Sequence, residues 1–374
     1  MKATYPSSMM NRFGTLLVSV ALTAAGAASA QTPAPGAPVD QAPAAQQPAT
    51  AAPAPSEPHY PTIAVGALAY LQYDAELKNR DAYNAFDLTR GYINIMGDLQ
   101  KNIRFRLTPD LRRVTDGSVA GSLVFRLKYG YVEFDELTPR SWLRFGLHQT
   151  PWLDFEESIN RYRVQGGMFT DREGIVPGSG DFGVGYLTRF PTDYGEINVG
   201  VYNGEGFARP EVDKHKSVQG RLTIRPFPKG SLSKGLRLSA FYDAGWYAAD
   251  RPRRHGIFMA SFEERHGVAT AQWVTGRERP VLRTVDAELR GYSVFGEVRQ
   301  GLQGWAGFAR FESLDPDRLT ADNNHRRTIA GVAYWLVWSN VRVGLVGSNE
   351  DVRYDAGAHQ PDENRLLFQT HVQF

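Results

Sequence analysis

The stretch that decides the fold is RLLFQTHVQF, residues 365–374. One face of this segment carries Leu366, Phe368, Thr370, Val372 and Phe374, and the other carries Arg365, Gln369, His371 and Gln373. Alternation with a period of two is typical of a β-strand with one apolar side. An open sheet that ended on such a strand would expose an edge to mispairing, whereas a closed barrel has no edge. We therefore interpret this segment as the last strand of a barrel whose strands have one lipid-facing and one water-facing side.

The same period recurs from Tyr60 onward, and almost no segment there has a helical period. We predict sixteen strands, at residues 61–73, 87–99, 101–109, 121–134, 140–149, 181–190, 194–203, 216–227, 235–248, 255–264, 267–276, 286–300, 303–314, 326–338, 340–351 and 363–374. After the first strand, long connections alternate with short ones to the end of the chain. An even strand number with short turns and long outer loops is typical of bacterial outer-membrane barrels. The predicted fold is an all-β, 16-stranded antiparallel transmembrane barrel formed by residues 60–374.

The N-terminal residues predict export from the cytoplasm. Lys2 and Arg12 precede an apolar run at residues 13–22, and small residues follow as far as Ala30. This pattern predicts a signal peptide over residues 1–30, because the run is shorter than the ~20 residues of a membrane-anchoring helix. Residues 31–59 are rich in Ala and Pro and predict a flexible linker, either a spacer or an arm that contacts another envelope component. The expected location is the outer membrane of a Gram-negative bacterium.

Composition excludes few classes of protein, but it is consistent with this interpretation. The chain has 37 glycines, no cysteine and a net charge of +2. A nearly balanced charge argues against a nucleic-acid-binding protein. Aromatic residues near the predicted strand ends suit the interfacial girdles of a membrane barrel. They include Tyr129, Tyr131, Trp142, Trp246, Tyr247, Trp335, Trp338 and Phe374. A two-layer soluble sandwich is the alternative, but charges such as Arg126 lie opposite the apolar face in mid-strand, where a sixteen-stranded barrel holds water.

Basic residues dominate the faces that we expect to line the lumen. They are Arg104, Arg106, Arg126, Lys128, Arg144, Arg189, Arg221, Arg225, Arg237, Arg299, Arg310 and Arg342. Acidic residues on these faces are fewer, and Asp243, Glu297 and Glu312 are the clearest. A cationic wall attracts anions, and arginine binds phosphate or carboxylate oxygens bidentately. The alternative is a solvated lumen of mixed charge without strong selectivity.

The longest connection, Thr150 to Gly180, predicts a constriction. Loops of this length usually have a function, and one that folds into the lumen would narrow it. The charged residues of this third outer loop are Asp154, Glu156, Glu157, Arg161, Arg163, Asp171, Arg172 and Glu173. The alternative is an extracellular flap.

Two neighbouring strands carry a family resemblance. Their sequences are Leu127-Lys-Tyr-Gly-Tyr-Val-Glu-Phe134 and Leu143-Arg-Phe-Gly-Leu-His-Gln-Thr-Pro151. They resemble the phosphate-selective porin O/P family, in which K-x-A-Y-V-E-(Y/F) leads into R-x-G-Q-F-K-x-P before the constriction loop. The resemblance implies an outer-membrane porin, often a homotrimer, with the third loop in the pore and basic residues around it. Arg144 and His148 match motif positions, although the family often has Lys where His148 stands, and its phosphate-selective members have a basic constriction.

Other motifs do not predict chemistry. The glycines at 178, 180 and 183 match G-x-G-x-x-G but precede a strand instead of a helix. Asp315-Pro-Asp317 and Asp322-Asn-Asn324 lack the spacing of an EF-hand Ca²⁺ site. No histidine belongs to a recognisable catalytic motif.

We therefore predict a passive channel for small hydrophilic solutes, with anions or phosphate as the candidate preference, and we expect no enzyme activity, metal or cofactor. Its expected partners are outer-membrane lipid and, through the C-terminal strand, the assembly machinery. The alternative is a non-porin barrel: a membrane-embedded hydrolase, or a structural protein that tethers the envelope through its Ala/Pro arm.

Overall fold

The computed structural model describes residues 59–78, 83–115, 117–211, 213–231, 233–248, 251–280 and 283–374. The predicted signal peptide and all of the predicted linker except His59 lie outside these residues. Among the described residues, no helix is long and apolar enough to cross a membrane.

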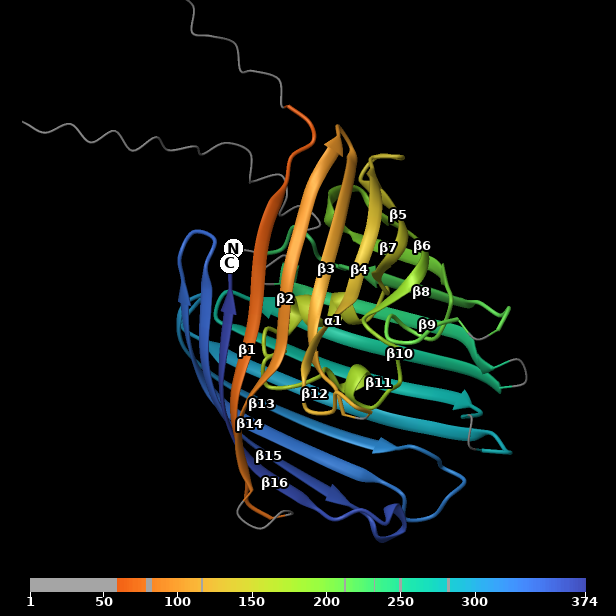
Figure 1. Ribbon diagram of the computed structural model, residues 1–374, viewed down its shortest axis with the longest axis vertical. Helices are drawn as coiled ribbons and strands as arrows, with labels where there is room; N and C mark the ends of the chain where they lie inside the picture. The colour runs from red at the N-terminus through yellow and green to blue at the C-terminus, as the bar shows by residue number, and fades with distance from the viewer. Residues whose placement is uncertain are drawn as a thin grey trace, which may run out of the picture. The chain divides into compact units, whose positions relative to one another are not determined.

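Sixteen strands in the described part of the chain form one closed antiparallel barrel (Figure 1), which confirms the predicted fold class. Each strand pairs with its neighbours in sequence, and β1 pairs with β16 to close the ring. The strands are β1 (Ala64–Glu76), β2 (Asn84–Gln100), β3 (Ile103–Arg113), β4 (Leu123–Asp135), β5 (Ser141–Gln149), β6 (Gly180–Arg189), β7 (Gly195–Tyr202), β8 (Ser217–Ile224), β9 (Leu236–Ala248), β10 (Arg251–Glu264), β11 (Gly267–Glu278), β12 (Ala287–Arg299), β13 (Gly304–Asp315), β14 (His325–Val337), β15 (Arg342–Tyr354) and β16 (Glu363–Gln373).

The helical segments among the described residues are short and lie in connections. Two α-helices, α1 (Leu153–Ile159) and α2 (Phe169–Arg172), belong to the long connection between β5 and β6. The 3₁₀ turns are η2 (Pro191–Asp193), η3 (Ser233–Gly235) and η4 (Ala356–Ala358).

The C-terminal strand closes the barrel as its alternation predicts. Ala69 lies opposite Val372 in the β1–β16 pair. Ala67 and Phe374 then exchange two backbone hydrogen bonds, of 2.9 and 3.0 Å. These bonds satisfy polar groups that would otherwise form an open sheet edge at the seam.

Several strand boundaries and one connection differ from the prediction. β1 begins and ends about three residues later than expected, and β10 begins at Arg251 instead of residue 255. The basic sequence Arg251-Pro-Arg-Arg254 has the composition of a loop. Arg253 can nevertheless lie in a strand, because its buried guanidinium Nε donates to Asp243 Oδ2 at 2.8 Å. As a result the β9–β10 connection is only residues 249–250, and the strict alternation of long and short connections is wrong there.

The outer surface of the barrel is apolar. Phe125, Phe258 and Phe368, from strands on different sides of the ring, are each 60% exposed. Leu345 is also exposed between the buried Gly344 and Val346, and Val332 is exposed beside the buried Ala333. An apolar surface that continues around a barrel fits the hydrocarbon core of a membrane and does not fit water.

The interior of the barrel has one apolar side. Phe241, Met259, Phe295, Phe308 and Val346 belong to one buried hydrophobic cluster with the residues of α1 and α2. Three of the aromatic residues that we expected in interfacial girdles, Tyr129, Trp142 and Trp335, are also buried inside. The prediction for these three is wrong. Tyr129 and Trp335 pack against the β5–β6 connection, and the Trp142 ring lies 4.1 Å from the Arg144 guanidinium.

Candidate functional site: opposed charged surfaces inside the barrel

The loop segment, residues 150–179, packs against the inner face of the barrel wall from β8 to β16. Figure 1 shows α1 enclosed by the strands. The Trp152 ring lies 5.6 Å from that of Phe241, and the Tyr162 ring stacks on Phe308 at 3.8 Å between centroids. Burial of such large aromatic side chains stabilises the docked segment by several kcal/mol. At its end the segment rejoins the wall at Gly180, where a Cβ would lie 2.9 Å from the Tyr129 ring.

Polar contacts fix the loop segment at sites spread over several strands. Arg161 Nε donates to Glu297 Oε1 on β12 at 2.7 Å. Arg172 forms an ion pair of 3.2 Å with Glu312 on β13, and Glu173 accepts a 2.9 Å hydrogen bond from His325 on β14. Arg161, Arg172 and Glu173, which we predicted to line a constriction, therefore face the wall and hold the segment in place.

Glu156 also faces the wall instead of the lumen, which corrects the prediction for this residue. Its Oε2 accepts from Trp152 Nε1 at 3.2 Å and from Thr170 Oγ1 at 2.9 Å, and its Oε1 accepts from Gln272 Nε2 on β11 at 3.0 Å. Burial raises the pKa of this carboxyl to about 7, because desolvation disfavours the charged form.

The remaining acidic residues of the loop segment form its acidic loop face, defined as Asp154, Glu157 and Asp171. Asp154 is exposed, and the side chains of Glu157 and Asp171 are 28% and 23% exposed. Arg163 bridges the last two, with its Nε 2.7 Å from Glu157 Oε1 and one Nη 2.5 Å from Asp171 Oδ2. Burial alone would raise the pKa of Glu157, but the positive charges of Arg163, Arg90 and Lys128 outweigh it and lower that pKa.

The facing surface is a basic wall on β2, β3 and β4, defined as Arg90, Arg106 and Lys128. None of the three forms an ion pair with a described residue. Their hydrogen bonds go to neutral groups: Arg90 and Lys128 donate to the Tyr92 hydroxyl, Lys128 at 2.5 Å, and Arg106 donates to Asn94 Oδ1 at 2.8 Å. The positive charge of this wall is therefore not cancelled by its own neighbours.

Aromatic rings hold these cations in position. Arg106 lies 4.7 Å from the centre of the Tyr129 ring. Lys128 lies 4.8 Å from the Tyr92 ring and 5.2 Å from the Phe207 ring. Each ring attracts a cation through its electron-rich face without neutralising it.

The other predicted basic residues fall into distinct groups. Arg104, Arg126 and Arg144 lie on the inner side of β3 to β5, but each pairs with a carboxylate. Their partners are Glu133 and Asp135 for Arg104, Asp110 for Arg126 and Glu133 for Arg144. The prediction of an excess of unpaired cations is wrong at these positions. Glu133 was missed although it belongs to the quoted family motif, and Asp110 was missed because the predicted strand ended at residue 109, whereas β3 continues to Arg113.

Further predicted residues lie away from the two opposed surfaces. Arg221 Nε donates to the Pro151 carbonyl at 2.8 Å, and an Arg310 Nη donates to Gln165 Oε1 at 3.1 Å, so both anchor the loop segment. His148 is fully buried between the rings of Tyr131 and Tyr202. The rest lie at or beside the short turns between strands: Arg189, Arg225, Arg237, Arg299 and Arg342.

Functional candidates that sequence reasoning missed include Arg90 and Tyr92 on β2. Arg90 lies in a predicted strand, but it was not assigned to the lumen because the strand alternates only weakly. Glu350 was also missed. It accepts from Gln165 at 2.9 Å and pairs with Arg327 and Arg365, which connects the loop segment to β14, β15 and β16.

The enzyme alternative concerns the serine, histidine and acidic side chains of the described residues. No serine hydroxyl among them hydrogen-bonds to a histidine ring, and none of their acidic, histidine or cysteine side chains form a group suited to a metal ion. Both ring nitrogens of the buried His255 are occupied, by the Ile175 carbonyl and by Glu278. Asp317, which belongs to the Asp315-Pro-Asp317 sequence considered above for Ca²⁺, accepts hydrogen bonds within its own loop, from Thr320 Oγ1 and from the Leu319 N–H.

A closed sixteen-stranded barrel with a loop packed inside it defines a porin-type fold. No family model matches the chain, and no curated protein matches its sequence. Solved structures do resemble it. The anion-selective porin of Comamonas acidovorans is similar with a TM-score of 0.61 at 11% identity, over 84% of this chain and 100% of that one.

Two further structures have the same fold. The outer membrane protein OmpT of Vibrio cholerae matches with a TM-score of 0.57 at 10% identity, over 85% of this chain and 99% of that one. The outer membrane channel DcaP of Acinetobacter baumannii matches with a TM-score of 0.55 at 11% identity, over 84% of this chain and 97% of that one. Identities this low establish the fold alone, so membership of the phosphate-selective O/P family stays a prediction.

Proposed function

We propose that the protein is an outer-membrane porin through which small hydrophilic solutes diffuse between the acidic loop face and the basic wall. The observation that carries this proposal is the opposition of these two surfaces inside a closed barrel with an apolar exterior. Facing surfaces of opposite charge orient a polar solute and replace part of its hydration. Comparable barrels that are named as porins or channels support the proposal.

We further propose a preference for anions, and phosphate is one candidate solute. Arg90, Arg106 and Lys128 have no carboxylate partner among the described residues, whereas two of the three acids on the opposite surface already share Arg163. The local balance therefore favours entry of a negative solute, which the partly exposed Arg90 and Arg106 can contact directly, whereas Lys128 itself is buried. A homotrimer, as in one in-vitro-folded form of the Vibrio cholerae protein, is also part of this proposal.

Planar-bilayer recording tests both parts. Purified protein should form stable channels, and under a KCl gradient the reversal potential should have the sign of anion selectivity. Added phosphate should reduce the chloride current if it occupies the same path. Absence of stable conductance would refute the porin function, and cation selectivity would refute the anionic preference alone.

A matched pair of variants locates the selectivity. Arg90→Gln combined with Arg106→Gln removes the two partly exposed charges of the basic wall and should shift the reversal potential toward zero or toward cation selectivity. Arg353→Gln removes an exposed charge, 58% accessible, on β15 and should leave the reversal potential unchanged. Equal selectivity in the double variant and the wild type would show that the basic wall does not select the solute.

A further inference from the structure

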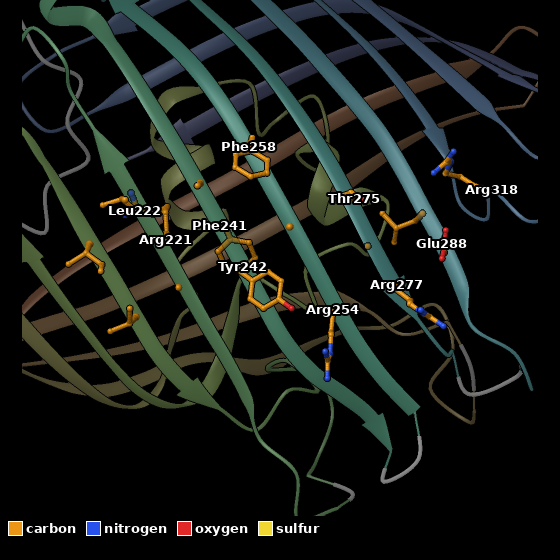
Figure 2. Close-up of a pocket in the computed structure, with 17 residues that line it drawn as sticks. Arg221, Leu222, Phe241, Tyr242, Arg254, Phe258, Thr275, Arg277, Glu288 and Arg318 are labelled. Atoms are coloured by element: carbon orange, nitrogen blue, oxygen red, sulfur yellow. The ribbon is translucent and has the colours of Figure 1, made fainter.

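The outer face of the barrel carries a groove across β7 to β12 that the transport function does not use. Its volume is about 700 Å³. Figure 2 shows Leu222, Tyr242 and Phe258 on neighbouring strands along this groove. A second groove of about 630 Å³ adjoins it and shares Leu222, Ala240 and Phe258 with it. Together they form a continuous apolar depression on the surface that faces lipid.

Small residues give the groove its depth. Ala240 lies beside Leu222 and Phe258 in the strand register, and Gly256 lies between Tyr242 and Thr275. A Cβ on Gly256 would approach nothing closer than Thr275 Cγ2, at 3.7 Å, so packing within the protein does not require glycine there. The missing side chain leaves open space beside Tyr242 and Thr275, within the groove.

Three arginines surround one end of the groove, on the side of the barrel where the long loops lie. Arg254 and Arg277 are direct neighbours in the β10–β11 register and both are exposed. Arg318, from the β13–β14 connection, lines the same groove (Figure 2). Like charges directly opposite each other on adjacent strands destabilise a sheet. An anion bound between them would remove that repulsion.

Acidic residues nearby only partly compensate these charges. Arg277 Nε donates to Asp286 Oδ2 at 2.8 Å, but Arg279 shares the same carboxylate. Glu288 lies beside Arg277 in the register and also lines the groove. Arg254 and Arg318 make no ion pair with any described residue. The end of the groove therefore keeps a net positive charge next to an apolar channel.

We propose that this groove binds a phosphorylated lipid of the membrane leaflet on the loop side. Its phosphate would lie between Arg254 and Arg277, close to Arg318, and its acyl chains would lie along Gly256, Ala240 and Phe258. Arginine binds phosphate oxygens bidentately, and the contact is strong next to a low-dielectric surface. An acyl chain gains little free energy when it moves from the surrounding lipids into the groove. The phosphate and the shape of the groove therefore determine which lipid is bound. A second copy of the chain would bring the same basic surface and suits the site less well.

Native mass spectrometry of the purified full-length protein tests this site, with bisphosphorylated lipid A as the probe. The wild type should retain one probe molecule, and should not retain the fully dephosphorylated form of the same lipid. Arg254→Gln combined with Arg277→Gln should lower retention at least about tenfold, because two charge-assisted contacts are lost. Gly256→Leu should lower it through the shape of the groove alone. Arg353→Gln, an exposed arginine on β15 outside the groove, should retain the lipid as the wild type does.

Each opposite outcome overturns the proposal. Equal retention by the double arginine variant, or equal retention of the dephosphorylated lipid, would show that phosphate is not recognised at this site. Dissociation of an oligomer by Gly256→Leu, without loss of lipid, would assign the groove to a subunit interface. The variants lie on the outer surface, and their folding is checked by the difference in gel mobility between unheated and boiled samples. Channel conductance tests the porin function separately. No groove variant changes the basic wall, so the lipid proposal can fail while the conductance of these variants stays unchanged.

Discussion

Glu156→Gln tests whether the carboxyl under the loop segment titrates near neutral pH. Burial raises its pKa from 4.5 to about 7. At about 1.4 kcal/mol per pH unit, this difference corresponds to about 3 kcal/mol of free energy of unfolding. The folded-state pKa is above the unfolded value. The stabilising contribution is therefore fully present below pH 4.5 and is lost as the pH rises through about 7.

The glutamine variant removes the titration but keeps the hydrogen bonds. Its carbonyl oxygen can accept from Trp152 and Thr170, as Glu156 Oε2 does. Its side-chain amide can donate to Oε1 of Gln272, which is buried and has no hydrogen-bond partner. This requires only that the Gln272 amide group rotate by half a turn, so that Oε1 faces residue 156. Unlike the wild type, the variant should therefore not lose this stability between pH 5 and pH 8.

Urea unfolding in lipid vesicles at pH 5 and pH 8, followed by tryptophan fluorescence, measures this difference. Between pH 5 and pH 8, the free energy of unfolding of the wild type should fall by up to about 3 kcal/mol more than that of Glu156→Gln. Glu157→Gln is the control on the same helix, because the pKa of Glu157 is lowered and its charged form stabilises the fold. Because a carboxyl with a lowered pKa is ionised in both the folded and the unfolded state above about pH 5, Glu157→Gln should keep the wild-type loss of stability between pH 5 and pH 8. Identical pH dependence in Glu156→Gln and the wild type would refute the reasoning.

Two further predictions concern the barrel itself. Glu350→Gln should lower the free energy of unfolding by about 3 kcal/mol, because Arg327 and Arg365 would lose a buried partner; an unchanged urea midpoint would contradict this. Deletion of Phe374 should reduce the amount of assembled barrel in the membrane, since the Ala67–Phe374 hydrogen bonds close the seam and a terminal aromatic residue resembles the assembly signal of outer-membrane proteins. Normal membrane levels of the deletion variant, measured by immunoblotting of outer-membrane fractions, would count against that role.

The predicted site illustrates where sequence reasoning stops. Arg104 and Arg144 were assigned to the inner side from alternation, and the structure places them there. The same alternation could not reveal that Glu133 pairs with both, because the partners come from different strands and their register is set by the whole sheet. His148 matched a motif position, yet it is buried between two tyrosines that are distant in sequence.

The sequence by itself determined that the chain forms a barrel, how many strands it has and which strands meet at the seam. These follow from local periodicity and from turn residues, which act over a few positions. The tertiary structure decided how the interior is divided between an apolar half under the loop segment and a charged half opposite it. That division depends on where residues 150–179 dock, and docking is the sum of contacts such as Tyr162 on Phe308 and Arg161 on Glu297 that join positions more than a hundred residues apart.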